Sequence, residues 1–316
     1  MYRAGFVGLV GLPNAGKSSL LNFLVQEKVS IVTEKPQTTR RRILGLWSQD
    51  RGQAVFVDAP GLVESDSGLN GFLHQEVLEV SQESDVLVAV LGLDSDRPAS
   101  IERVLDLVVS QKKPWRALIT KTDLRGFEHR HLRIQEMVRE RGGQFHSLSL
   151  KGKGPERKGS VSAALNEEFK LDREAILNDL LGLLPEAKKP LYDIELFTPE
   201  TMRNLVAEIV REKCFENVHQ EIPYQLAVRI LKYDENAGPC PRITAEIVVA
   251  KENHKAIVIG KGGLVLKEIG TRARMAIEKL VGEKIFLQLH VSVSPDWMKN
   301  KKLMKEFGYK HDKKLG

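Results

Sequence analysis

With 316 residues, the chain is long enough for two domains of ordinary size, each with its own apolar core. No apolar run approaches the roughly 20 residues of a membrane-spanning helix. Two cysteines, Cys214 and Cys240, exclude a disulfide framework and favour free thiols in a reducing cytoplasm. Residues 251–316 hold 15 Lys and Arg against 7 Asp and Glu, so the net charge of +6 is concentrated at this end. This predicts a polyanionic partner there; the alternative is a merely solubilising lysine-rich tail.

A strand, a glycine-flanked loop and a helix follow one another near the start of the chain. Residues 6–10 form a short apolar run, residues 11–18 read G-L-P-N-A-G-K-S, and residues 19–25 carry an apolar stripe at helical spacing. This context is typical of a phosphate-binding loop, whose backbone N–H groups and helix N-terminus face phosphate oxygens. Lys17 would reach the terminal phosphates and Ser18 would bind Mg²⁺; the alternative is a chance Gly-Lys-Ser turn. The predicted nucleotide contacts are Asn14, Ala15, Gly16, Lys17, Ser18 and Ser19.

Two strands, residues 43–47 and 54–57, follow the polar loop of residues 29–42 and form a plausible hairpin. The second strand runs directly into Asp58-Ala59-Pro60-Gly61. Asp58 could hold the magnesium ion through a water, and the Gly61 N–H could bond the γ-phosphate. Alone, this short pattern is equally a good turn. Its position about 40 residues after the phosphate loop favours the nucleotide site.

Helices alternate with strands up to residue 184, which predicts a doubly wound, mostly parallel α/β sheet. The next strand, residues 115–119, ends in Thr120-Lys121-Thr122-Asp123. The other expected strands are residues 85–91 and 145–150, and the expected helices are residues 72–80, 101–110, 127–141 and 172–184. We assign residues 1–185 to this domain and residues 186–198, rich in proline and lysine, to a linker.

Residues 199–316 predict a smaller α+β domain with a basic C-terminal tail. A helix over residues 198–214 precedes strands over residues 225–233 and 243–250. We expect Ala256–Ile259 to be a short strand that leads into Gly260-Lys261-Gly262-Gly263, followed by a helix over 264–280 and a strand over 285–293. A G-x-x-G loop that opens a helix is typical of the KH module, although a simple helix N-terminal turn is the alternative. The predicted RNA-binding residues are Gly260, Lys261, Gly262, Gly263, Lys267, Arg272 and Arg274.

The motifs together resemble the bacterial Era family of GTPases over almost the whole chain. The resemblance rests on G-x-P-N-x-G-K-S at 11–18, P-x-T-T-R at 36–40, D-x-P-G at 58–61 and the KH loop. It implies a P-loop GTPase domain followed by a type II KH domain, with GTP or GDP and magnesium as cofactors. It also implies binding to the 3′ region of small-subunit ribosomal RNA, a role in assembly of the small ribosomal subunit, and a cytoplasmic monomer. Peripheral contact with the inner face of the cell membrane is a further candidate.

The resemblance assigns base recognition to three places. The Asp123 carboxylate would accept hydrogen bonds from guanine N1–H and N2, and Lys121 would pack along the base. Thr120 stands where the family usually has Asn, and it retains a hydroxyl that can tie the loop to its neighbours. Ser162-Ala163 resembles the remaining base-contacting loop, and Ser149-Leu150-Lys151 is a second candidate farther from the closing helix.

Catalysis must differ from that of GTPases with a water-orienting glutamine, because Leu62 follows the D-x-P-G motif. The expected catalytic residues are Asn14, Lys17, Thr39 and Gly61, and the expected metal ligands are Ser18, Thr39 and Asp58, with Thr38 as the alternative to Thr39. Asn14 resembles an asparagine that helps to hold potassium in related GTPases; its other role would be to brace the phosphate loop.

Three functions fit these patterns to different degrees. The leading hypothesis is a GTP-hydrolysing switch whose KH domain binds RNA. The alternative is an RNA-binding scaffold with a structural nucleotide site that does not turn over. Asp123 and the absence of an acceptor-substrate lid pattern argue against a third interpretation, a metabolic P-loop kinase.

Overall fold

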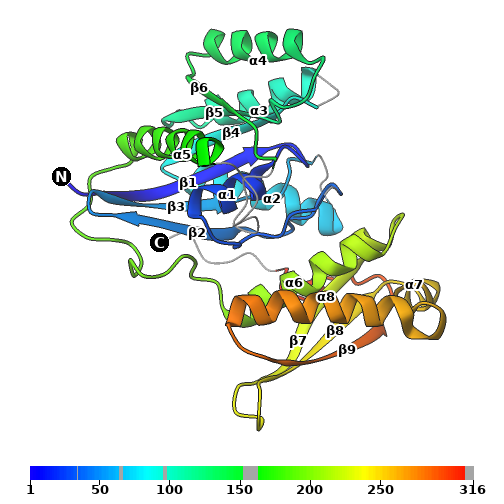
Figure 1. The fold of residues 1–316 in the computed structure, drawn as a ribbon. Coiled ribbons are helices and arrows are strands. Elements are labelled where there is room, and N and C mark those ends of the chain that lie inside the picture. Colours follow the sequence, from blue (N-terminus) through cyan, green and yellow to red (C-terminus); the bar gives the residue numbers. More distant parts are fainter. Residues whose placement is uncertain (34, 64–66, 95–97, 152–162, 310–316) are drawn as a thin grey trace.

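A six-stranded sheet with the order β2-β3-β1-β4-β5-β6 forms the first half of the molecule (Figure 1). The structure is a computed structural model that describes residues 1–33, 35–63, 67–94, 98–151 and 163–309. Strand β2 pairs antiparallel with β3, as the predicted hairpin requires, and the other neighbours are parallel. The strands are β1 (Arg3–Gly11), β2 (Ile43–Gln49), β3 (Gly52–Asp58), β4 (Val86–Gly92), β5 (Trp115–Thr120) and β6 (Phe145–Leu148).

Helices cover both faces of this sheet, so its central strands are apolar on both sides. In β4, Val88 belongs to the core under α1 and α5, whereas Leu87 belongs to the core under α2, α3 and α4. The helices are α1 (Lys17–Val25), α2 (Gly68–Glu83), α3 (Pro98–Ser110), α4 (Glu128–Glu140) and α5 (Ala163–Leu183). The predicted doubly wound α/β fold is confirmed. Loops that follow the parallel strands meet at one edge of the sheet, where such folds bind ligands.

The second half folds around a three-stranded sheet with the order β7-β8-β9. Strand β7 is antiparallel to β8, and β8 is parallel to β9. One face of the sheet packs on α6 and α8 through a core that includes Val210, Ile247 and Ile269. This confirms the predicted α+β domain. Its elements are α6 (Met202–Asn217), η2 (Ile222–Gln225), β7 (Leu226–Asp234), β8 (Arg242–Val249), α7 (Glu252–Ile259), η3 (Lys261–Gly263), α8 (Leu264–Val281) and β9 (Phe286–Val293).

Two predictions for this domain are wrong in detail. Residues 256–259 are the last turn of α7 and not a strand, because His254 and Val258, four residues apart, are both buried on one helical face. A four-residue apolar run alone cannot distinguish the two structures. Helix α6 begins at Met202, where the Thr201 side chain accepts a hydrogen bond from the Asn204 N–H.

The C-terminal segment of residues 297–309 is not merely a basic tail. It contains α9 (Lys301–Glu306), and Trp297, Met304, Phe307 and Tyr309 are buried. These side chains form one apolar cluster with Leu69, Phe72 and Leu73 of α2 and with Ala227 and Val248 of the second sheet. The segment therefore joins the two domains. In the part of the chain that is described, no helix is both long and apolar enough to cross a bilayer.

Candidate functional site

The phosphate loop between β1 and α1 has the backbone conformation that its glycines allow. Gly16 has φ +94°, a left-handed conformation that side-chain-bearing residues rarely adopt. A Cβ at Gly11 would lie 2.4 Å from the Val90 carbonyl oxygen, and one at Gly61 would lie 2.6 Å from Pro13. The loop and its neighbours enclose a cavity of about 910 Å³ lined by Pro13, Asn14, Gly16, Lys17, Ser18, Ser19, Ile31, Val32, Thr33, Lys35, Gln37, Thr38, Thr39, Gly61, Asp94, Lys121, Phe215, Glu216 and His219.

Lys17 is buried at the base of this cavity. Its Nζ donates hydrogen bonds to the carbonyl oxygens of Gly11, at 3.1 Å, and Leu12, at 2.8 Å. Burial lowers the pKa of Lys17 to about 8, and the nearby Asp58 carboxylate only partly opposes this shift. A buried cation at the helix N-terminus is well placed to meet phosphate charge.

Hydroxyl and carboxylate oxygens converge beside Lys17. Ser18 Oγ lies 2.6 Å from Asp58 Oδ2 and 2.8 Å from Thr39 Oγ1, and Thr39 Oγ1 lies 3.3 Å from Asp58 Oδ2. Ser30, which the sequence patterns do not single out, donates to the same carboxylate oxygen at 2.8 Å. The other oxygen, Asp58 Oδ1, is buried and has no hydrogen-bond partner among the described residues. Burial raises the pKa of Asp58, whereas Lys17 and the hydroxyl groups oppose the shift.

These oxygens fit a hard divalent cation such as Mg²⁺. An unpartnered buried carboxylate oxygen is costly, and ligation of a cation would satisfy it directly or through a water. Of the two candidate threonines, only Thr39 is placed with Ser18 and Asp58. The Thr38 hydroxyl instead contacts Thr33 Oγ1 and the Lys35 carbonyl, each at 2.8 Å.

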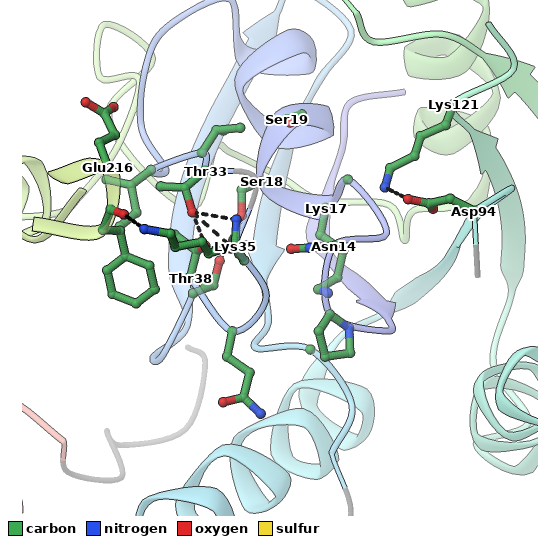
Figure 2. A pocket seen from close by; sticks show the side chains of 18 of the residues that line it. Asn14, Lys17, Ser18, Ser19, Thr33, Lys35, Thr38, Asp94, Lys121 and Glu216 are labelled. Carbon is green, nitrogen blue, oxygen red and sulfur yellow. Dashed lines mark hydrogen bonds and ion pairs between the residues drawn. The ribbon is translucent and has the colours of Figure 1, made fainter. Parts of the chain in front are cut away.

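The residues predicted to recognise a base lie at the end of β5 and just after it, and of these Lys121 lines the cavity. Thr120 Oγ1 donates a 2.6 Å hydrogen bond to the Ala15 carbonyl, so this hydroxyl ties the end of β5 to the phosphate loop. Lys121 forms an ion pair with Asp94, and Figure 2 shows the two side chains pointing toward one another. Asp123 Oδ1 accepts a 2.6 Å hydrogen bond from the Ser149 hydroxyl.

The structure brings the second candidate base loop to this place. Ser149 contacts Asp123, and Leu150 Cδ1 lies 3.8 Å from the position of a Cβ on Gly16. Of the preferred pair, Ser162 lies outside the described residues and Ala163 is the first residue of α5. Residues 149–151 directly follow β6, just as the other predicted nucleotide contacts directly follow their strands.

The segment after β3 carries no side chain suited to orienting a water at position 62. The Leu62 N–H donates a 2.9 Å hydrogen bond to the Gly11 carbonyl, and its side chain packs against the core under α2 and α3. Gly61 and Asn14 both line the cavity, and Asn14 has φ +61°. All four expected catalytic residues, Asn14, Lys17, Thr39 and Gly61, therefore line one cavity.

The wall of the cavity includes residues that the sequence patterns do not single out. Phe215, Glu216 and His219 come from the end of helix α6 and the residues just beyond it, in the second domain. Lys35 Nζ donates to the carbonyl oxygens of Phe215 and Val218, the latter at 2.5 Å. Figure 2 shows Lys35 reaching toward this segment. Only the folded two-domain arrangement could reveal these contacts.

A second cavity, of about 400 Å³, lies between α8 and β9. It is lined by Gly263, Leu266, Lys267, Gly270, Thr271, Arg274, Leu287 and Leu289. The Gly260-Lys261-Gly262-Gly263 turn lies between α7 and α8, and its three glycines have positive φ angles of 73°, 60° and 78°. A Cβ at Gly262 or Gly263 would meet nothing within 4 Å, so the backbone is open to a ligand there.

The basic residues predicted to bind RNA do not all lie at this groove. Lys267 and Arg274 line it, and Lys261 is exposed on the loop. Arg272 instead pairs with Glu268 at 2.5 Å and lies 4.0 Å from Glu216 of α6.

Comparison with known proteins identifies both halves. A family model described as 50S ribosome-binding GTPase matches residues 6–121, and a KH domain model matches residues 221–298. GTPase Era from Geotalea uraniireducens and from Syntrophus aciditrophicus are each 37% identical to this chain, over 98% of its length and 98% and 96% of theirs.

Two solved structures match over 98% of this chain and 100% of their own, at 32% identity. One is a variant of Aquifex aeolicus Era bound to GDP and AlF4⁻, with a TM-score of 0.85. The other is Era in complex with MgGDPNP and nucleotides 1506–1542 of 16S ribosomal RNA, with a TM-score of 0.86.

Proposed function

The chain belongs to the GTPase Era family, and from this premise we propose that it hydrolyses GTP in the 910 Å³ cavity and binds ribosomal RNA in the groove of its KH domain. The observation that carries the GTPase function is the convergence of Ser18, Thr39 and the partly unpartnered Asp58 beside the buried Lys17. The similarity to the GTPase Era relatives favours turnover over the scaffold alternative.

Each residue around the phosphates has a distinct task. The Lys17 ammonium would contact the β- and γ-phosphates, and the Gly61 N–H would donate to the γ-phosphate. Ser18, Thr39 and Asp58 would hold magnesium, which neutralises charge between the β- and γ-phosphates when bound. Position 62 supplies no glutamine to orient the attacking water, because Leu62 stands there and packs into the core. Asn14 would contribute a ligand to potassium or brace the loop.

Guanine would be recognised by Asp123. Its carboxylate can accept hydrogen bonds from N1–H and N2 of guanine, whereas adenine offers neither donor at these positions. The Ser149 hydrogen bond would fix the carboxylate, and Lys121 would pack along the base. We place the base-contacting loop at residues 149–151, where Ser149 already contacts Asp123.

RNA would bind through the KH loop and the adjacent groove. The solved structure of Era in complex with nucleotides 1506–1542 of 16S ribosomal RNA supports this proposal. In this chain, the open backbone at Gly262 and Gly263 would approach RNA phosphates, Lys261, Lys267 and Arg274 would supply charge, and Leu266, Leu287 and Leu289 would contact bases.

The proposed function includes a cellular partner, a cellular role and a division of the chain into domains. We propose that the RNA partner is the 3′ region of small-subunit ribosomal RNA and that the protein assists assembly of the small ribosomal subunit. It would act as a cytoplasmic monomer. The basic residues of 251–316 would favour peripheral contact with an anionic membrane face. We assign the GTPase domain to residues 1–185, the linker to 186–198 and the KH domain to 199–316.

Two measurements test the proposal. GTP turnover by the purified chain distinguishes the enzyme from the scaffold, which would bind GTP without releasing phosphate. A crosslinking map of RNA bound in cells should concentrate at the 3′ end of small-subunit ribosomal RNA. A map spread evenly over unrelated transcripts would contradict the assignment of the partner.

A further inference from the structure

Thr39 and Arg40 are consecutive residues of one loop, but their side chains contact different domains. Thr39 Oγ1 lies 2.8 Å from Ser18 Oγ and 3.3 Å from Asp58 Oδ2, at the metal side of the nucleotide cavity. Arg40 points the other way and is only 2% exposed. Its Nη1 donates to the Leu226 carbonyl at 2.6 Å and its Nη2 donates to the Pro223 carbonyl at 2.7 Å. One planar guanidinium thus bridges two backbone carbonyls of the KH domain.

Aromatic side chains enclose the same guanidinium. Its carbon lies 5.5 Å from the ring centroid of Phe215, and Tyr309 Oη lies 3.4 Å from Arg40 Nη1. Tyr309 also meets the Phe72 ring of α2 edge-on, with the ring centroids 6.0 Å apart. Arg40 therefore lies where the loop of Thr39, the C-terminal segment and the helix after the Gly61 loop come together.

The rest of this loop also rests on helix α6. Glu212 of α6 accepts a hydrogen bond from Lys28 Nζ at 2.9 Å and from the Val32 N–H at 3.2 Å. Lys35 Nζ donates to carbonyl oxygens at the end of α6, and Arg41 pairs with Glu200 at 3.2 Å. The contacts with α6 precede Thr39, and the Arg41–Glu200 pair, just before the start of α6, follows it, so the loop is held against the KH domain on both sides of Thr39.

We propose that Arg40 is a positioning residue that holds Thr39 at the metal and γ-phosphate side of the site by anchoring its loop in the KH domain. The KH domain then completes the GTP-binding form of the nucleotide site. This rests on the proposed GTPase function and adds a specific link between the two domains. Among the described residues, the hydrogen bonds of the Arg40 guanidinium go to Leu226, Pro223 and Tyr309 and not to a predicted nucleotide contact.

Coupling in the reverse direction follows from thermodynamic linkage. Helix α6 packs against α8, which lines the groove proposed for RNA. A nucleotide that fixes Thr39 therefore favours the docked position of α6, and RNA that favours this position of α6 tightens GTP binding. The factor by which RNA raises the affinity for GTP equals the factor by which GTP raises the affinity for RNA. Without Arg40, the two binding events become more nearly independent.

The test compares Arg40→Ala and Arg40→Lys with a matched control in the full-length protein. Lysine keeps the charge but presents one ammonium group, which cannot reproduce the planar fork across two carbonyls. Arg51→Ala is the control, because Arg51 is an exposed arginine that bonds Asn178 at 2.8 Å within the GTPase domain. Affinities for a non-hydrolysable GTP analogue and for GDP are measured by titration over a range of magnesium concentrations.

For both Arg40 variants, we expect affinity for the GTP analogue to fall about tenfold and the magnesium requirement to rise, with GDP affinity within about twofold of wild type. The selective loss arises because Thr39 serves the metal and the γ-phosphate. Equal losses for GTP and GDP would show that Arg40 is merely structural, and unchanged affinities would show that the anchor is unnecessary; either result overturns the proposal.

The measurement is separate from the proposed function. Failure to hydrolyse GTP or to bind RNA in the wild type would overturn the proposed function, whereas the ratio of GTP to GDP affinities tests Arg40 without either activity. Should Arg40→Ala fail to fold, Arg40→Lys and Tyr309→Phe still decide the matter. The second removes only the hydroxyl beside Arg40, and we expect a smaller loss in the same ratio.

Discussion

The Ser149 hydroxyl donates a 2.6 Å hydrogen bond to the Asp123 carboxylate, which joins the end of β6 to the segment after β5. If residues 149–151 form the base loop, Ser149→Ala should weaken GTP and GDP binding by roughly threefold to tenfold, the effect of one lost hydrogen bond. Ser162→Ala should leave both affinities unchanged. Fluorescence titration with labelled nucleotides checks both variants; the reverse pattern would restore residues 162–163 as the base loop.

Asp123 should determine the choice of base. With Asp123→Asn, the guanine N1–H and N2 donors face an amide, and we expect GTP affinity to fall by roughly tenfold to a hundredfold. Xanthosine triphosphate should bind better, because its C2 carbonyl can accept a hydrogen bond from the new amide. Asp106→Asn is a suitable control, since Asp106 pairs with Arg141 on the surface. Equal binding of GTP and ATP by the wild type would show that Asp123 does not select guanine.

Lys17 should give nucleotide binding a dependence on pH. Its pKa is about 8 in the free protein, against an ordinary value of 10.5. The unfolded chain therefore holds this proton more tightly than the folded protein does. Burial of the ammonium lowers the free energy of unfolding in full below about pH 8, and this destabilisation disappears as the pH rises toward 10.5. Nucleotide binding has the opposite sign, because phosphate charge favours the protonated form.

We expect GTP affinity to decline from about pH 8 to pH 9, by at most about tenfold per pH unit, with an uptake of protons on binding. Calorimetric titration in two buffers of different ionisation enthalpy measures this uptake. A constant affinity without proton uptake over this range would show that Lys17 stays protonated in the free protein.

We predict that Asn14 makes GTP hydrolysis dependent on a monovalent cation. It lines the cavity beside Lys17, and Leu62 stands at the position where related GTPases have a water-orienting glutamine. If Asn14 helps to hold potassium, exchange of potassium for sodium should slow GTP hydrolysis several-fold, and Asn14→Ala should abolish the difference between the salts. Asn178→Ala, on the surface of α5, should retain it. Identical wild-type rates in both salts would leave Asn14 only its bracing role.

Local patterns predicted the phosphate loop and the strand ends because each depends on residues that are close in sequence. The strand ends bring Thr120 and Asp58 to one edge of the sheet, and the fold class follows from the alternation of elements. Arg40, Lys35 and Phe215 could not be linked in this way, since their contacts depend on how two domains dock. The packing of Tyr309 could not be predicted either, because the C-terminal segment is rich in lysine. Its high charge suggests a solvent-exposed tail, yet four of its large apolar side chains pack on α2.

Binding of a 16S 3′-terminal RNA oligonucleotide to wild type and to Gly262→Asp, each with a GTP analogue and with GDP, tests the central claim most directly. Gly262 has φ +60°, which aspartate tolerates, and open space for a side chain, so the variant should fold while placing a carboxylate where RNA phosphates approach. Gly238→Asp is the matched control, with positive φ and open space on the β7–β8 loop.

We predict that wild type and Gly238→Asp bind RNA more tightly with the GTP analogue than with GDP. Gly262→Asp should lose at least about a hundredfold in RNA affinity and retain normal nucleotide affinity. A folded Gly262→Asp protein with wild-type RNA affinity would contradict the account.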